Sequence, residues 1–171
     1  GTVSNHHLHH VAGLAVTLAE MIAFGEAYAS QIIANAKVLA QALYEEGFEV
    51  LCEHKGFTES HQIAINVLKH GGGAAVAQKL ERANIIINKN LLPSDKDPEE
   101  PRGIRLGVQE LTRIGMRESE MKEIASLMGR IVIRNADETK VKGNVIELRK
   151  NFQSVQYCFD GRDAYKFPEL T

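Results

Sequence analysis

The sequence predicts an α+β protein in which long helices precede a small domain built on an open sheet. Between residues 9 and 48 there is no proline, and Ala, Leu, Ile, Val and Met dominate, as is typical of helices. After residue 47 the pattern changes to short strands divided by turns, with helices between them. The 171 residues have the length of one ordinary domain, and a hydrophobic content of 44% is enough for a buried core.

The N-terminal region predicts two helices. The first, over residues 9–23, is apolar around most of its circumference, so we expect other parts of a larger assembly to bury it on several sides. The pattern breaks around residues 24–26. In the second helix apolar side chains return at a spacing of three to four residues, and Gly47 ends it.

The remainder predicts a small α+β unit with an open sheet. Strands are expected at residues 48–52, 62–68, 85–87 and 103–108. Helices are expected at residues 74–83, 118–134 and 137–152. The last residues, up to 171, are expected to form a partly ordered tail.

Composition argues against several classes of partner. The 20 basic and 22 acidic side chains give a formal charge of −2, so no electrostatic excess favours nucleic acid or an anionic membrane surface. The longest nearly apolar run, residues 11–23, is shorter than the roughly 20 residues that a bilayer requires, so no membrane span is predicted. Two cysteines without CxxC spacing and the lack of a signal peptide favour the cytoplasm. Because Gly1 rather than Met comes first, we expect the chain to be part of a longer protein.

Four of the seven histidines cluster at the start of the first helix. His6, His9 and His10 would share one helix face at a spacing that a metal ion can use, but no acidic or cysteine ligand accompanies them. Histidines there more often cap or pack, so no metal site is predicted. Ser4 and Asn5, together with the amides of a helix N-terminus, suit either an anion such as phosphate or a plain helix cap.

An arginine inside an apolar strand is another candidate. Residues 103–107 read Gly-Ile-Arg-Leu-Gly, and Arg105 is costly to desolvate there unless its guanidinium meets a carboxylate or a phosphate. Its planar fork suits a carboxylate bidentately. A structural ion pair with Glu110 or Glu118 is the alternative, and the pattern leaves both open. Residues 88–90, Asn-Lys-Asn, place amide and ammonium donors at a strand end, or form an ordinary turn.

Several motifs follow one another in a specific order. They are Ala-Asn-Ala-Lys at residues 34–37, Thr-Glu-Ser-His at 58–61, Asn-Lys-Asn at 88–90 with Pro93 and Asp95, Gly-Ile-Arg-Leu-Gly at 103–107, and Leu-Thr-Arg at 111–113. Over residues 4–134 this order resembles the serine hydroxymethyltransferase family, whose members are pyridoxal-phosphate enzymes of the aspartate-aminotransferase fold. The third and fourth motifs are the specific ones.

The resemblance implies the C-terminal part of such an enzyme. Residues 1–47 would be the last helices of the large cofactor domain, and residues 48–171 the small C-terminal domain. The implied activity of the intact homodimer interconverts serine and glycine and transfers a one-carbon unit to tetrahydrofolate or a related tetrahydropterin, with pyridoxal phosphate as cofactor. The Schiff-base lysine of the family lies upstream of these residues, so the chain alone is expected to be inactive.

Site residues also follow from the resemblance. Arg105 would bind the amino-acid carboxylate, Asn90 would lie beside the folate, and Ser4 and Asn5 would contact the cofactor phosphate of the partner subunit. The loop at residues 4–6 reads Ser-Asn-His where the family usually has Gly-Gly-Pro. Two alternatives stay open: another enzyme of the same fold, such as a threonine aldolase or an α-oxoamine synthase, and a non-catalytic dimerising module.

Overall fold

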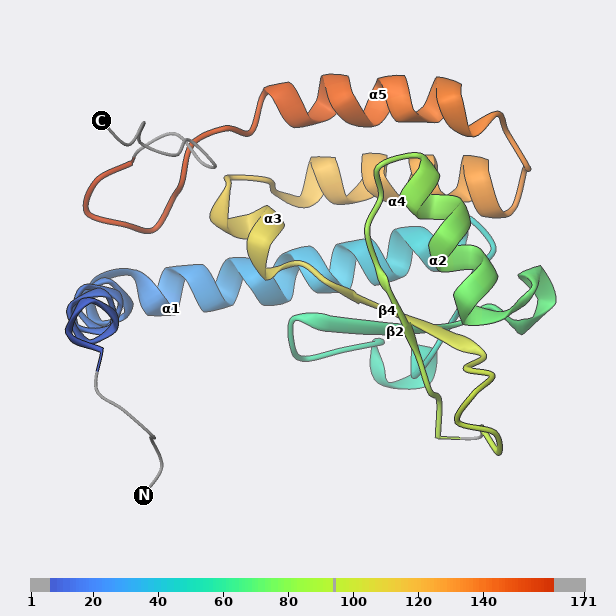
Figure 1. Cartoon of the computed structure of the whole chain (residues 1–171), viewed down its shortest axis with the longest axis horizontal. Coiled ribbons are helices and arrows are strands. Elements are labelled where there is room, and N and C mark those ends of the chain that lie inside the picture. The colour runs from blue at the N-terminus through green and yellow to red at the C-terminus, as the bar shows by residue number, and fades with distance from the viewer. Residues whose placement is uncertain (1–6, 94, 162–171) are drawn as a thin grey trace.

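The computed structural model describes residues 7–93 and 95–161. A long helix, α1 (Leu8–Glu45), precedes a four-stranded antiparallel sheet (Figure 1). The strand order is β1-β2-β4-β3, with β1 at Glu49–Val50, β2 at Gln62–Asn66, β4 at Gly103–Gly107 and β3 at Asn88–Asn90. The other helices are α2 (Gly72–Arg82), α3 (Gln109–Arg113), α4 (Glu118–Val132) and α5 (Glu138–Lys150), with 3-10 turns η1 (Glu53–Lys55) and η2 (Leu68–His70). The predicted fold class, helices followed by a small open sheet, is confirmed.

Helices cover one face of the sheet. In Figure 1 the sheet lies below α1, with α4 and then α5 above it. Along β2 and β4 buried and exposed side chains alternate, so Ile63, Ile65, Ile104 and Leu106 face the helices. They share one core with apolar side chains of α1, α2 and α4, and each buried Leu, Ile or Met there contributes about 1.5–3 kcal/mol. The alternate side chains point to the opposite face, which we call the outer face of the sheet.

Helix α1 is continuous, so the prediction of two helices is wrong. Its assignment as helix runs unbroken through Phe24, Gly25 and Glu26. A glycine inside a helix costs only about 1 kcal/mol relative to alanine, and the flanking residues are good helix formers without proline. The helix nevertheless changes direction: in Figure 1 its darkest-blue N-terminal part is seen end-on, while the rest lies across the view.

The N-terminal part of α1 carries exposed apolar side chains. Leu8, Val11, Leu14, Val16, Leu18 and Ile22 are all more than half exposed, and Ile22 reaches 89%. Because the helix does not end at residue 23, the sequence argument against a membrane span fails. One window of α1, with mean hydropathy 1.4, passes the length and composition test for a spanning helix. That test is weak evidence, since apolar helices of water-soluble proteins pass it too.

The third predicted strand lies three residues further along the chain. Residues 85–87 do not pair; Ile85 and Ile87 pack against the core, while Ile86 is 84% exposed. Pairing with β4 begins at Asn88, opposite Arg105. The Asn-Lys-Asn sequence is therefore itself an edge strand, and its asparagines are not turn residues.

Candidate functional site

Arg105 lies on the outer face of the sheet. Its neighbours Ile104 and Leu106 are buried on the helix side, so the strand alternation turns Arg105 away from the core and leaves it exposed. The apolar sequence around Arg105 had indicated a buried arginine, and that interpretation is wrong. The side chain stays hydrated and accessible to a ligand from outside.

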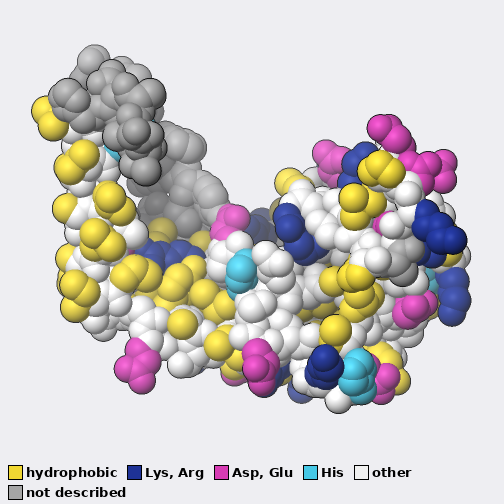
Figure 2. Space-filling model, turned by 90° about the horizontal axis from the view of Figure 1, so that it is seen from below, with side chains coloured by type: hydrophobic (Ala, Val, Ile, Leu, Met, Phe, Trp, Pro, Cys, Tyr) yellow, Lys and Arg dark blue, Asp and Glu magenta, His cyan; other side chains and the backbone are white. Residues whose placement is uncertain are grey.

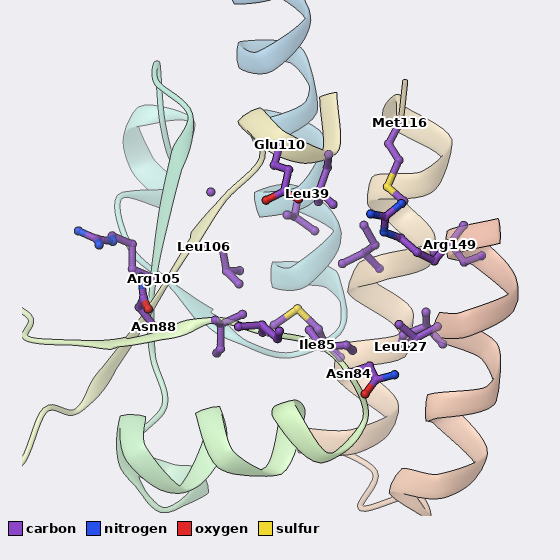
Figure 3. Close-up of a pocket in the computed structure, with 18 residues that line it drawn as sticks. Leu39, Asn84, Ile85, Asn88, Arg105, Leu106, Glu110, Met116, Leu127 and Arg149 are labelled. Carbon is purple, nitrogen blue, oxygen red and sulfur yellow. The ribbon is translucent and has the colours of Figure 1, made fainter. Parts of the chain in front are cut away.

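The proposed ion pair of Arg105 is also absent. Among the described residues no carboxylate lies within ion-pair distance of its guanidinium, so neither Glu110 nor Glu118 is its partner. Figure 3 shows the guanidinium pointing away from Glu110 and out of the apolar pocket beside it. A charged, planar donor group that faces outward is suited to an anionic ligand.

Strand register brings Asn90 to the same face as Arg105. Asn88 lies directly opposite Arg105, and Asn90 lies opposite Gly103, two residues before Arg105. Residues two apart on a strand share a face, so Asn90 and Arg105 are diagonal neighbours, at a typical Cα separation of about 7–8 Å. The Asn90 side-chain amide donates to the Leu91 carbonyl at 2.8 Å. The structure thus groups two of the four predicted site residues and adds Asn88, which sequence reasoning had not assigned.

The approach of β3 and its following loop to β4 requires Gly103. A Cβ at this position would lie 2.5 Å from a Leu92 side-chain carbon and 2.8 Å from the Asn90 carbonyl oxygen. Those distances are shorter than van der Waals contact. The first glycine of the Gly-Ile-Arg-Leu-Gly motif therefore allows Asn90 and Arg105 to lie as close as they do.

A pocket of about 430 Å³ lies on the other side of this strand. Its lining comes mainly from apolar side chains of α1, α4, α5 and the segment before β3, with Arg149 of α5 opposite Arg105 (Figure 3). Only part of Arg105 lines this pocket, since its guanidinium leaves it. The outer face is therefore the candidate site, and the pocket adjoins it at Arg105 and Asn88.

Behind β4 a buried polar contact holds α3 against α1. The Asn35 side chain is fully buried and donates to the Thr112 hydroxyl at 2.9 Å and to the Met116 carbonyl at 3.0 Å. Thr112 in turn donates to the Val108 carbonyl at 2.8 Å. Asn35 and Thr112 both belong to the motifs noted in the sequence, and their contact fixes the chain immediately after β4.

A second contact ties α3 to the bent part of α1 and to the C-terminal segment. Arg113 forms a half-buried ion pair with Glu20 at 2.8 Å and donates to the Tyr157 carbonyl at 2.9 Å. Its guanidinium also lies 5.6 Å from the ring centre of Tyr28. Burial raises the pKa of Tyr28 against the lowering effect of Arg113, so its hydroxyl stays protonated and donates to the Gln109 carbonyl.

Some of the functional residues predicted near the N-terminus are not among those that the structure describes. Ser4, Asn5 and His6 are not among the described residues. The rings of His7, His9 and His10 contact one another, with centroids 4.1–5.8 Å apart. Within residues 7–93 and 95–161 no group of three or more His, Cys, Asp or Glu side chains is arranged to hold a metal ion.

Figure 2 shows the side of the molecule to which the outer face of the sheet turns. The molecule is hollowed between the column on the left, which is the N-terminal part of α1, and the body that carries the sheet. Hydrophobic side chains run along the column. The view is from below Figure 1, the side to which the outer face turns. The described core lies on the opposite face of the sheet, and Arg105 is exposed on this one.

Comparison with known proteins decides the family. The model of the family described as serine hydroxymethyltransferase matches residues 1–128, three quarters of the chain. The chain belongs to the serine hydroxymethyltransferase family. It is 56% identical over 169 residues to the serine hydroxymethyltransferase of Methanocella arvoryzae and 57% identical over 173 residues to that of Methanopyrus kandleri. These alignments include 98% and 99% of this chain but 40% of each relative, so the chain spans about 40% of their length.

A solved structure supports the fold. The L-threonine transaldolase of Pseudomonas fluorescens, crystallised in its internal aldimine state, superposes with a TM-score of 0.74 at 32% sequence identity. The superposition covers 85% of this chain and 33% of the transaldolase. The small sheet and its helices therefore recur in an enzyme that acts on an amino acid.

Proposed function

We propose that this chain forms the small-domain part of a serine hydroxymethyltransferase. The intact enzyme would transfer the hydroxymethyl carbon of serine to a tetrahydropterin and leave glycine. Family membership supports this proposal, and the observation that carries it to a site is Arg105, which points outward from the outer face and forms no ion pair with a described carboxylate. A guanidinium on a rigid strand can hold the amino-acid carboxylate through two parallel hydrogen bonds.

Arg105 would act by orienting the substrate. With its carboxylate fixed by Arg105, serine can rotate little, so the bond to be broken keeps one direction. Pyridoxal phosphate, when bound, supplies the electron sink for this chemistry. Ser4 and Asn5 would contact the cofactor phosphate of the partner subunit, and both lie outside the described residues.

Asn90 would lie beside the one-carbon carrier. Its amide is a diagonal neighbour of Arg105, so a carrier contacting Asn90 would stand next to an amino acid held by Arg105. Amide groups pair well with the nitrogen and oxygen edge of a pterin ring. Tetrahydrofolate and related tetrahydropterins share that edge, and both are candidates.

The rest of the enzyme would cover the exposed part of α1. In this proposal residues 1–47 are the last helices of the large cofactor domain and residues 48–171 the small domain. The row of exposed apolar side chains from Leu8 to Ile22 would pack against the large domain and the partner subunit of a homodimer. We place the enzyme in the cytoplasm, and the Schiff-base lysine in the part of the relatives that this chain does not span.

A second candidate is an aldolase-type enzyme of the same fold. The likeness to the L-threonine transaldolase favours it, since that enzyme shares 32% of the aligned residues. Both candidates need Arg105 for the amino-acid carboxylate. They differ at Asn90, which is needed only where a pterin binds.

A graft tests the proposal. The matching 40% of the Methanocella arvoryzae enzyme is replaced by this chain, which is 56% identical to it. We expect the graft to form glycine from serine only in the presence of a tetrahydropterin, and Asn90→Ala to raise the KM for the pterin. A folded graft that binds pyridoxal phosphate, cleaves threonine and ignores every tetrahydropterin would establish the second candidate instead.

A further inference from the structure

Asp95 is a buried carboxylate that the proposed mechanism does not use. Its side chain is 2% exposed and lies in the loop between β3 and β4. One oxygen, Oδ2, accepts hydrogen bonds from the backbone N–H of Leu92 at 2.9 Å and of Arg102 at 3.0 Å. The other, Oδ1, accepts from Arg102 Nε at 2.5 Å. A buried charge with three donors stabilises one conformation of the loop.

The two ends of this loop are held differently. The end that enters β4 has other contacts: the Arg102 carbonyl accepts from Val67 N–H, and the Pro101 carbonyl accepts from Gly73 N–H, both at 2.9 Å. The end that leaves β3 follows an edge strand of three residues and begins with Leu91 and Leu92. Because Asp95 accepts hydrogen bonds from both Leu92 and Arg102, it connects the end of the loop after β3, which has fewer contacts, to the end before β4, which has more.

We propose that Asp95 is a positioning residue that holds Asn90 on the outer face beside Arg105 and thereby determines the affinity for the one-carbon carrier. This inference rests on the proposed function. Asp95 acts on Asn90 more than on Arg105, because Arg105 is also held by pairing with β2 opposite Ala64. The expected consequence of losing Asp95 is weaker pterin binding with serine binding retained.

Hydrogen bonding to Asp95 favours its ionised form. The Leu92 N–H first, and then the contacts from Arg102, lower the pKa of Asp95 despite its desolvation. The carboxylate is therefore charged at neutral pH. An amide at this position keeps the shape but places an NH₂ group against at least one of the three donors, so one contact is lost in either orientation.

The first experiment measures amide hydrogen exchange of the 171-residue chain. Asp95→Ala removes the acceptor of all three bonds and should lower the protection of the Leu92 amide about tenfold, as expected for loss of a charged hydrogen bond, and leave the Val67 and Gly73 amides within about twofold. Asp97→Ala is the matched control, since Asp97 lies in the same loop and its side chain accepts only from the exposed Glu99 N–H in the described structure. Unchanged protection of Leu92 in Asp95→Ala overturns the proposal.

The second experiment measures kinetics in the graft. Asp95→Asn should raise the KM for tetrahydrofolate about tenfold and leave the KM for serine within about twofold, whereas a merely structural role would raise both. Should Asp95→Asn not fold, Arg102→Gln keeps both backbone bonds and should raise the pterin KM by about threefold. An unchanged pterin KM in an active graft overturns the role of Asp95 alone, whereas an unsubstituted graft without turnover overturns the proposed function and this role together.

Discussion

Replacing Arg105 with lysine tests whether its guanidinium binds the substrate carboxylate or stabilises the fold. Lysine keeps the positive charge but replaces the fork of two parallel donors by a single ammonium group. Since Arg105 is exposed and has no ion pair with a described carboxylate, folding should change by no more than about 0.5 kcal/mol. Loss of a charge-assisted bidentate contact to the substrate should cost about 3 kcal/mol, which is roughly a hundredfold in kcat/KM.

The assay uses one preparation of the graft for both quantities. kcat/KM for serine is measured at saturating tetrahydropterin, and Tm by calorimetry. Arg130→Lys is the matched control, since Arg130 lies on α4 and contacts only exposed Asn144 in the described structure. Unchanged serine kinetics with a lowered Tm would refute the carboxylate role and give Arg105 a structural role instead.

Three further outcomes are expected. Asn35→Ala should destabilise the chain by about 2–3 kcal/mol in urea unfolding because it leaves buried partners without a donor, whereas Gln41→Ala, on the exposed side of α1, should have little effect. Because the pKa of Asp95 is lowered, protection of the loop should be complete above the ordinary carboxyl range and be lost as the pH falls below about 4; protection that is constant down to pH 2 would contradict this. The chain should sediment as a dimer or larger species, and Leu14→Lys with Ile22→Lys should shift it toward monomer; a monomer before substitution at tens of micromolar would contradict coverage of α1 by a second copy.

Local patterns in the sequence predicted most of the elements. The predicted bounds of β2, β4, α4 and α5 lie within two residues of the observed ones; alternation of apolar residues supported the prediction of β2, and the 3.6-residue period supported that of α4. The error at β3 has a local cause. Residues 85–87 are β-branched, which suits a strand, but Ile85 and Ile87 pack against the core instead. Pairing of the polar residues Asn88 to Asn90 with β4 depends on the partner strand, which no local pattern describes.

The sequence predicted which residues belong to the candidate site but not how they are arranged in space. Arg105 and Asn90 were identified, yet their diagonal placement depends on the register between β3 and β4, which the sequence does not show. Asn35 and Thr112 lie 77 residues apart, so their hydrogen bond has no signal in spacing. One signal in the sequence could have pointed to Asn35, Thr112 and Asp95: all three stand in the recognisable motifs although no role was assigned to them.

Contacts at the two ends of β4 explain how the backbone of Arg105 is held in place without an ion pair between its guanidinium and a described carboxylate. Before the strand, the Arg102 carbonyl accepts from the Val67 N–H and the Pro101 carbonyl accepts from the Gly73 N–H. After it, the Val108 N–H donates to the His61 carbonyl, and the Val108 carbonyl accepts from the Thr112 hydroxyl. A long side chain recognises a carboxylate bidentately only when its backbone is fixed, because each loose torsion spreads the guanidinium over more positions. Substitution of Thr112, which holds the end after β4, should therefore weaken serine binding in proportion to the mobility it gives Arg105, whereas loss of Asp95 leaves these contacts at both ends of β4 in place.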